Sequence, residues 1–375
     1  MSPWFSASAV APHLQSLWGL TATQVGGLTA AVQLGFVAGT ALAALLNLAD
    51  LLPARALFAG SALLAAAANA SLLLADGYAG ALPSRFLTGF FLAGIYPPAM
   101  KMVATWFREG RGLAIGTLIG SLTLGKALPY FIGVFEAADF RRVVWGTTAA
   151  AAGAALLVGA AYADGPFRFE RRAFSWRLAP AILAHRETRL AIGGYLGHMW
   201  ELYAMWTWAP AFLAASLAAR GGTSAPEWLA SLLAFGAIAA GSAGCVWGGW
   251  AADRIGRERL VTRAMAASGG CALCIGLSFG GPLWLVALLA WTWGFFVVAD
   301  SAQFSTLVTE VAPPHAVGTA LTLQTSLGFL LTLATIQLVP LIQLAAGWRW
   351  AFPILALGPA AGIACIARLR AAREG

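Results

Sequence analysis

Charged side chains are scarce in this chain, since only 10% of its 375 residues are Asp, Glu, Lys or Arg. A soluble domain carries roughly 25%, and 60% of this sequence is hydrophobic, so a water-soluble monomer is excluded. The net charge of +8 could suit nucleic acid, but the arginines lie between apolar runs rather than on one face. There they orient a membrane protein and meet anionic lipid. We therefore expect an integral membrane protein whose partners include membrane lipids and no nucleic acid.

Cysteine and histidine are also rare, with four of each. Cys271 and Cys274 form a C-x-x-C, but no second pair and no histidine follows at the spacing of a zinc site. The polar residues within the apolar segments show no nucleophile–base set. The sequence therefore predicts no metal site, no cofactor and no enzymatic activity. The start of the chain shows no basic n-region or cleavage site, and we expect no signal peptide.

Long apolar runs fill the rest of the sequence. Windows of about 20 residues suffice to cross a bilayer as a helix and are too long for barrel strands. We expect twelve membrane spans, at residues 2–17, 24–48, 55–75, 81–104, 112–135, 142–162, 189–216, 228–251, 260–279, 282–309, 316–343 and 348–368. In the fifth span, Gly112, Gly116 and Gly120 recur at a spacing of four, which lets helix backbones approach closely.

Loop arginines predict the orientation. If both termini are cytoplasmic, most arginines fall in inside loops, as the positive-inside rule requires. The exceptions are Arg85, Arg141, Arg142, Arg220 and Arg349. We expect a multi-pass protein of the plasma (inner) membrane, acting as a monomer. The basic segment 163–188 is the one long inside loop, and it separates an N-terminal six-helix bundle, 1–162, from a C-terminal one, 189–375.

The two halves repeat. Asp50 ends the second expected span as Asp253 ends the eighth, and Arg142 opens the sixth as Arg349 opens the twelfth. Internal duplication of this size is typical of secondary transporters, whose binding sites lie between the halves near the bilayer midplane.

The first span is short by comparison with the seventh. If Pro12 corresponds to Pro210, the inner half of the first helix would precede Met1. We expect a truncated first helix, with a short or unwound first helix as the alternative.

One segment carries a family resemblance. Residues 249–259, Gly-Trp-Ala-Ala-Asp-Arg-Ile-Gly-Arg-Glu-Arg, resemble the G-x-x-x-D-R-x-G-R-[RK] loop of the major facilitator superfamily, which joins helices 8 and 9 in that family. The first-half copy, 48–55, keeps Asp50 and Arg55 but lacks the glycines. Arg85-x-x-x-Gly89 resembles the family's second motif. The resemblance implies an all-α membrane protein of twelve transmembrane helices in two pseudo-symmetric six-helix bundles.

The loop motif implies a conformational latch. By the family's arrangement, Asp253 would face the start of the fifth span near Gly112, and Asp50 the start of the eleventh near Gly318. A carboxylate is stabilised at the positive N-terminal end of a helix. The arginines assigned to the latch are Arg55, Arg254 and Arg257. The alternative is an inert polar turn.

A third motif is broken. Proton-coupled drug exporters of this superfamily carry G-x-x-x-x-G-P-x-x-G in the fifth span. Here residues 120–129 read Gly-Ser-Leu-Thr-Leu-Gly-Lys-Ala-Leu-Pro, so Lys126 replaces the proline. This weakens the interpretation as a multidrug antiporter.

The chain contains two lysines, Lys101 and Lys126, and both fall within expected spans. An ammonium group in the hydrocarbon core costs roughly 2.5–3.5 kcal/mol on insertion scales. Lys126 lies near the predicted midplane. Lys101 lies near the inner end of its span, where it could instead be a solvated gate residue.

Intramembrane charges sort by sign between the halves. Arg85, Lys101 and Lys126 supply cations from the first half, while Glu201 and Asp300 supply anions from the second. We expect Lys126 to pair with Asp300 or Glu201 when the halves close, because lone buried charges are unfavourable. An anionic substrate would replace the carboxylate, and protonation would release that carboxylate. The alternative for Lys126 is a structural salt bridge or a snorkelling side chain.

Four polar or aromatic residues complete the predicted cavity: His198, Trp206, Gln33 and Gln324. His198 could titrate near neutral pH, although packing is the alternative for it and for Trp206. Residues 96–98, Tyr-Pro-Pro, are expected to kink the fourth span, because prolines lack the N–H of a helical hydrogen bond.

Together these features predict a secondary active transporter that moves a small organic anion or amphiphile by alternating access, linked to protons as a symporter. A drug or metabolite exporter is the first alternative. A non-transporting scaffold or assembly factor is the second. A transition-metal importer is disfavoured because no Met-x-x-x-Met pair is present.

Overall fold

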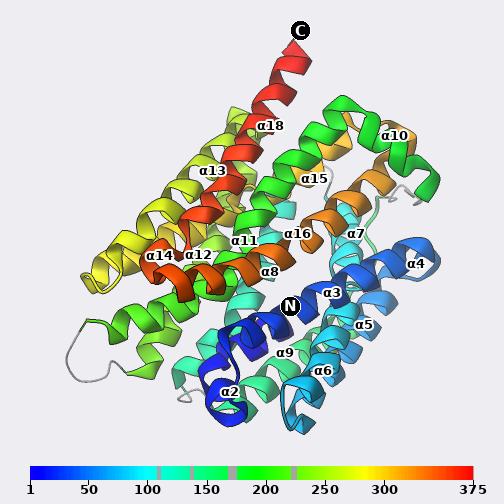
Figure 1. Ribbon diagram of the computed structural model, residues 1–375. Helices are drawn as coiled ribbons and strands as arrows, with labels where there is room; N and C mark the ends of the chain where they lie inside the picture. Colours follow the sequence, from blue (N-terminus) through cyan, green and yellow to red (C-terminus); the bar gives the residue numbers. More distant parts are fainter. Residues whose placement is uncertain (108–110, 136–138, 168–174, 221–225, 375) are drawn as a thin grey trace.

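The structure is a computed structural model and describes residues 1–107, 111–135, 139–167, 175–220 and 226–374 (Figure 1). Within these residues every regular element is helical, so the expected all-α class is confirmed. The elements of the first half are η1 (Ser2–Phe5), α1 (Ser6–Ala9), α2 (Ala11–Trp18), α3 (Ala22–Leu45), α4 (Leu48–Leu51), α5 (Ala54–Ala70), η2 (Ser71–Leu74), α6 (Tyr78–Leu92), α7 (Tyr96–Trp106), α8 (Arg111–Phe135) and α9 (Phe140–Ala161).

The second half is equally helical. It holds η3 (Trp176–Leu178), α10 (Ala179–Ala184), α11 (Arg186–Ala218), α12 (Glu227–Ile255), α13 (Arg257–Cys274), η4 (Ile275–Ser278), α14 (Leu283–Ala299), α15 (Ser301–Val311), η5 (Pro314–Ala316), α16 (Val317–Ala346), α17 (Trp348–Ala351), η6 (Pro353–Ala356) and α18 (Leu357–Glu374).

Ten helical segments of the described chain are long and apolar enough to cross a membrane. They coincide with ten of the twelve expected spans. The expected span 189–216 lies in α11, which at 33 residues is long enough but carries His, Glu and Tyr residues that reduce its apolar character. The expected span 2–17 is not one helix but three pieces, η1, α1 and α2.

Short turns interrupt that first segment. Val10, between α1 and α2, departs from helical geometry, and Pro12 at the start of α2 cannot donate the N–H that would continue α1. Gly19 then ends α2 in the left-handed region at φ 62°, where glycine carries no Cβ penalty. An unwound segment exposes main-chain carbonyls that a continuous helix would satisfy internally.

Two other spans are also broken. The fourth expected span divides into α6 and α7, with Tyr96 opening the second piece and Pro97 and Pro98 following. The expected kink is therefore confirmed. The tenth divides into α14 and α15, and Asp300 is the single residue between them.

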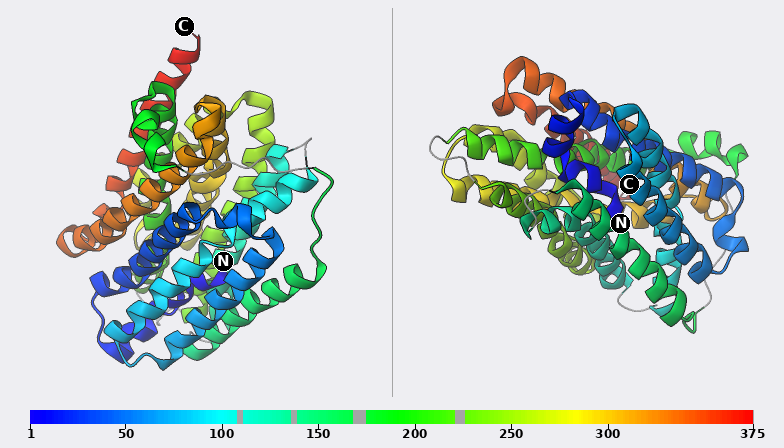
Figure 2. Two further views of the ribbon diagram at one scale, coloured as in Figure 1. Left: turned by 90° about the vertical axis from the view of Figure 1, so that its right-hand side faces the viewer. Right: turned by 90° about the horizontal axis from the view of Figure 1, so that it is seen from below.

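The helices of the two halves gather on opposite sides of the molecule (Figure 1), and the perpendicular views show the same division (Figure 2). Between them, α8 packs along α12 and α3 packs along α16. These two helix pairs form the main contact between the halves.

Glycines bring α8 and α12 together, as expected from their spacing. A Cβ on Gly116 would lie 2.7 Å from the carbonyl oxygen of Cys245, and one on Gly120 would lie 2.8 Å from that of Ser242. Near the other end of α8, a Cβ on Gly133 would lie 3.2 Å from the Oγ of Ser231. The halves therefore touch along most of this seam.

We expect Gly116→Leu to lower the free energy of unfolding by about 1–3 kcal/mol, because overpacking forces backbone shifts. The matched control is Gly153→Leu on α9, where an added Cβ meets nothing within 4 Å. Thermal unfolding of the detergent-solubilised variants measures both, and equal melting temperatures would contradict the close packing of α8 and α12.

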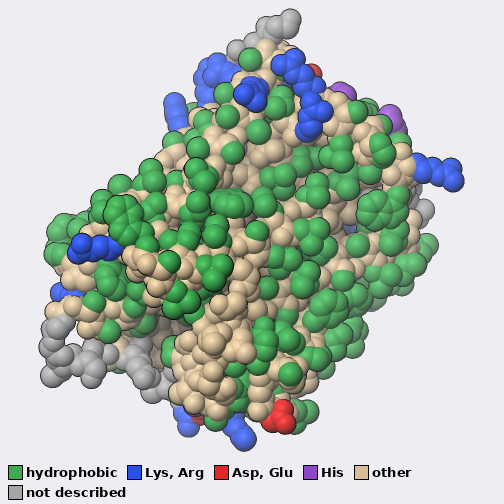
Figure 3. Space-filling view, in the orientation of Figure 1, with side chains coloured by type: hydrophobic (Ala, Val, Ile, Leu, Met, Phe, Trp, Pro, Cys, Tyr) green, Lys and Arg blue, Asp and Glu red, His purple; other side chains and the backbone are tan. Residues whose placement is uncertain are grey.

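Basic side chains gather at the end of the molecule where α18 terminates, whereas hydrophobic side chains cover most of the middle of the face shown (Figure 3). Large apolar residues such as Leu156, Leu157 and Trp291 are exposed on the molecular surface. Such a surface belongs in lipid, so the chain is a multi-pass integral membrane protein.

Candidate functional site

A cavity of about 110 Å³ lies between the halves. The first half contributes Met1, Trp4, Phe36, Tyr96, Ile119, Leu122, Thr123 and Lys126. The second contributes Tyr195, His198, Met199, Leu202, Tyr203, Trp206, Val298, Ser301, Ser305, Thr325 and Phe329. Pockets that bind drug-sized ligands measure roughly 300–1,000 Å³, so in this conformation the cavity is too small for such a ligand.

Among the described residues, Lys126 is the one lysine or arginine on this lining. It lies on α8 and is 8% exposed. Its Nζ donates a hydrogen bond of 2.6 Å to the hydroxyl of Tyr203. The same nitrogen lies 4.7 Å from the ring centroid of Trp4 and 4.6 Å from those of Tyr203 and Trp206. Aromatic faces attract a cation within about 6 Å, so these three rings form an aromatic cage around the ammonium group.

The cage joins the two halves. Tyr203 and Trp206 are three residues apart on α11, which places them on one helix face, while Trp4 comes from η1. Phe36 and Phe329 pack behind the cage with their ring centroids 4.5 Å apart. The Nε1 atoms of Trp4 and Trp206 are buried without a hydrogen-bond partner. The cage therefore offers donors and lacks an acceptor beyond the Tyr203 hydroxyl.

Arg85 is fully buried, but it does not line the cavity. Its guanidinium donates to the carbonyl oxygens of Pro3 and Trp4 at 3.0 and 2.6 Å, and to Ser6 and Asn69 at 3.0 and 3.2 Å. The carbonyls left free by the unwound segment are thus satisfied by one planar fork. Arg85 holds the backbone that carries Trp4.

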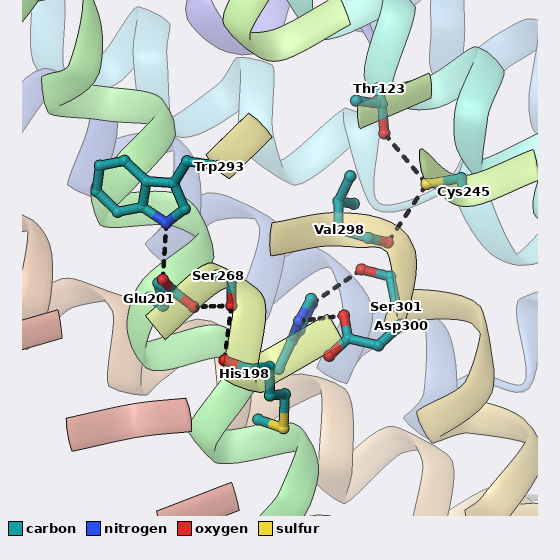
Figure 4. Close-up of polar contacts among 10 residues, drawn as sticks. Thr123, His198, Glu201, Cys245, Ser268, Trp293, Val298, Asp300 and Ser301 are labelled. Atoms are coloured by element: carbon teal, nitrogen blue, oxygen red, sulfur yellow. Dashed lines mark hydrogen bonds and ion pairs between the residues drawn. The ribbon is translucent and has the colours of Figure 1, made fainter. Parts of the chain in front are cut away.

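Glu201 lies within the second half and off the cavity. Its carboxylate accepts hydrogen bonds of 2.7 Å from Ser268 of α13 and from the Nε1 of Trp293 of α14 (Figure 4). Both carboxylate oxygens therefore have a donor, and the group ties three helices of one half together.

Asp300 occupies the break between α14 and α15 and faces His198 of α11 (Figure 4). The Nδ1 of His198 lies 2.9 Å from the Oδ1 of Asp300, an electrostatic contact whose alignment is not that of a hydrogen bond. The Nε2 of His198 lies 2.8 Å from the Oγ of Ser301. His198 and Ser301 line the cavity, whereas Asp300 lies behind them.

The expected ion pair of Lys126 with Asp300 or Glu201 is not formed in this structure. Each carboxylate contacts side chains of its own half, and the hydroxyl of Tyr203 takes the place of a carboxylate at Lys126. Sorting by sign predicted attraction across the cavity, but Glu201 accepts a hydrogen bond from the indole of Trp293 and Asp300 contacts the imidazole of His198 within the same half.

The remaining predicted residues lie outside the lining. Gln33 on α3 and Gln324 on α16 are buried, and their amide groups have no hydrogen-bond partner. Lys101 is half-buried on α7. Of the residues predicted to line the cavity, three do so: Lys126, Trp206 and His198. Tyr203, which the sequence analysis did not single out, also lines the cavity.

The start of α8 and the end of α12 meet as the loop motif implies. A Cβ on Gly112 would lie 2.7 Å from the Oδ2 of Asp253. The guanidinium of Arg254 stacks 3.7 Å from the ring centroid of Trp250. Arg257 forms an ion pair of 2.8 Å with Glu310.

The first-half copy of the latch is described less fully. Asp50 lies in α4, and its side chain is outside the described residues. Arg55 is exposed at the start of α5. Within the described residues, no group of three or more His, Cys, Asp or Glu is placed to hold a metal ion.

The described helices form a multi-pass membrane fold with a cavity between its two halves. The sequence profile of the Major Facilitator Superfamily matches residues 1–335, and the chain belongs to this family. No curated protein sequence matches the chain. Among solved structures, it is similar to the crystal structure of the human organic anion transporter MFSD10 (TETRAN), with a TM-score of 0.66 and 16% identity over 92% of this chain and 83% of that one. At this identity the likeness concerns the fold alone.

Proposed function

We propose that the protein is a secondary active transporter for a small organic anion or amphiphile, working by alternating access and linked to protons. The observation that carries the proposal is the ammonium group of Lys126, buried in the cavity between the halves with aromatic and hydroxyl partners and no carboxylate among the described residues. An uncompensated buried cation favours an anionic ligand, because a counter-charge offsets the desolvation cost of both groups.

The lining indicates the shape of this anion. Aromatic and aliphatic side chains surround the ammonium group of Lys126, so an anion with an apolar body matches the cavity best. The cavity must enlarge to admit such a solute, which requires the halves to separate on one side. A human organic anion transporter of similar fold shows that this fold can serve such a substrate.

The proposed architecture has two six-helix bundles, 1–162 and 189–375, joined by the inside loop 163–188. The broken first segment and α11 then supply the first and seventh spans. In this arrangement both termini are cytoplasmic, the protein resides in the plasma (inner) membrane as a monomer, and the bundles rock about the α8–α12 and α3–α16 seams.

The experiment is a thermal-shift screen of the purified protein with organic acids and amines, followed by counterflow in proteoliposomes. A ligand that binds the folded state raises the melting temperature, and we expect organic monoanions to do so. Benzoate, which carries one carboxylate on an aromatic body, is the first probe. Counterflow of amines alone would replace the anion assignment, and counterflow of no solute would favour a scaffold.

An exporter of apolar drugs or metabolites is the second candidate, favoured by the aromatic lining. Transport that is indifferent to substrate charge and to replacement of Lys126 would select it.

A further inference from the structure

The break between α14 and α15 places a buried acid beside a histidine that reaches the cavity. Asp300 is 1% exposed and is the single residue between the end of α14 and the start of α15. His198 bridges it to Ser301, with contacts of 2.9 and 2.8 Å. Interrupted membrane helices lining a cavity are where transporters bind coupling ions.

We propose that His198 and Asp300 together form the proton-binding site of this transporter, with Ser301 as its contact to the cavity. The inference rests on the proposed function and names the site that the coupling uses. It differs from the sequence expectation, in which a carboxylate exchanged directly with Lys126. Here the proton site is a pair within the second half, and it acts on the anion through charge across the cavity.

The charge balance of the pair explains the coupling. With a neutral imidazole and an ionised carboxylate, the pair carries one negative charge. One proton, taken from cavity water, makes the pair neutral, either as imidazolium against carboxylate or as imidazole against carboxylic acid. Proton uptake therefore removes a negative charge that would repel the anion, and Lys126 then attracts the anion unopposed by this pair. Because linkage is reciprocal, anion binding must favour proton uptake by the same factor.

Other titratable groups lie near this pair, and one of them is the α-amino group of Met1, which lines the same cavity. Tyr195 and Tyr96 line the same cavity, Cys245 of α12 donates to the carbonyl of Val298, and Glu201 is bonded to Ser268 and Trp293. Lys126, on the first-half wall of the cavity, donates a hydrogen bond to Tyr203 of α11 in the second half. Among the described residues, no lysine or arginine pairs with Asp300.

Glu201 supplies a matched control. It is as buried as Asp300, at 1% exposure, and lies three residues from His198 on the same helix. Its contacts are with Ser268 and Trp293, away from the cavity. Asp300→Asn and Glu201→Gln each replace one buried carboxylate by an amide of the same shape. The two substitutions therefore make the same chemical change at two different places.

The first test is independent of any substrate. Infrared difference spectra of the purified full-length protein between pH 6 and 8 should show a protonation change that Asp300→Asn and His198→Gln both remove and Glu201→Gln retains. If Asp300→Asn does not fold, His198→Gln carries the test alone. A spectrum unchanged in the folded Asp300 or His198 variant, or lost in Glu201→Gln alone, would overturn the proposal.

The second test uses benzoate. We expect wild-type affinity to rise roughly five- to tenfold on acidification across this range, the size of a typical coupling between sites, and to be flat in Asp300→Asn. In proteoliposomes, accumulation driven by a pH gradient should fall far more than counterflow in this variant. Undiminished gradient-driven accumulation in Asp300→Asn would sink the inference. Failure of wild-type counterflow with every organic acid, with the infrared result intact, would instead remove the proposed function.

Discussion

Lys126→Ala should reduce organic-anion counterflow by about 100-fold, because loss of an interaction with a charged group of about 3 kcal/mol corresponds to roughly that factor. Among the described residues, Lys126 is the one lysine or arginine on the cavity lining. Its removal leaves the cage of Trp4, Tyr203 and Trp206 in place but without a counter-charge for the substrate. Radiolabelled benzoate exchange in proteoliposomes measures the loss.

Lys126→Arg separates charge from geometry. The guanidinium is planar and larger than an ammonium, so it should fit the three-ring cage poorly and restore transport only in part. Lys101→Ala is the control, since it removes the other lysine, outside the cavity. If Lys126→Ala transported at the wild-type rate, the ammonium would be structural and the anion assignment would lose its basis.

Asp253→Asn should shift the conformational equilibrium toward opening at the inner end by roughly five- to thirtyfold. The carboxylate lies beside Gly112 in the first turn of α8, where charge at a helix N-terminus contributes about 1–2 kcal/mol in a favourable geometry. The asparagine keeps the shape and loses the charge. The readout is the labelling rate of a cysteine introduced at Thr325, on the cavity lining, by an impermeant maleimide added from the cytoplasmic side.

The native cysteines are replaced in the background of this experiment. Asp164→Asn provides the control, because it removes an exposed carboxylate of the linker at the same predicted side of the membrane. Equal labelling rates in the two variants would show that Asp253 is a polar turn residue rather than a latch.

Much of the helical framework could be predicted from the sequence, because lipid requires continuous apolar helices and loops collect the arginines. The kink before Pro97 and the close approach of α8 to α12 at Gly116 follow from single-residue chemistry. The division of 2–17 into short pieces does not, since hydropathy is blind to where a helix unwinds.

The cavity was predictable only in part. Lys126 stood out because lysine is so rare here, but its partners could not be read from the sequence. Period and composition do not distinguish a packing aromatic from one that faces a cation, so Trp4 and Tyr203 gave no separate signal. Complementary sign suggested a carboxylate at Lys126, whereas Glu201 is bonded to Trp293 and Ser268, and Asp300 contacts His198, all within the second half.

The contact of α8 with α12 has a kinetic consequence. Side chains that interlock across a helix pair must disengage before one helix can move past the other, but Gly116, Gly120 and Gly249 present nearly bare backbone. Two such surfaces can slide without first unlocking. In the proposed alternating-access cycle, the rate of opening and closing should then be set by the charged contacts at the helix ends. The glycine-lined middle of the seam should add little to the energy barrier.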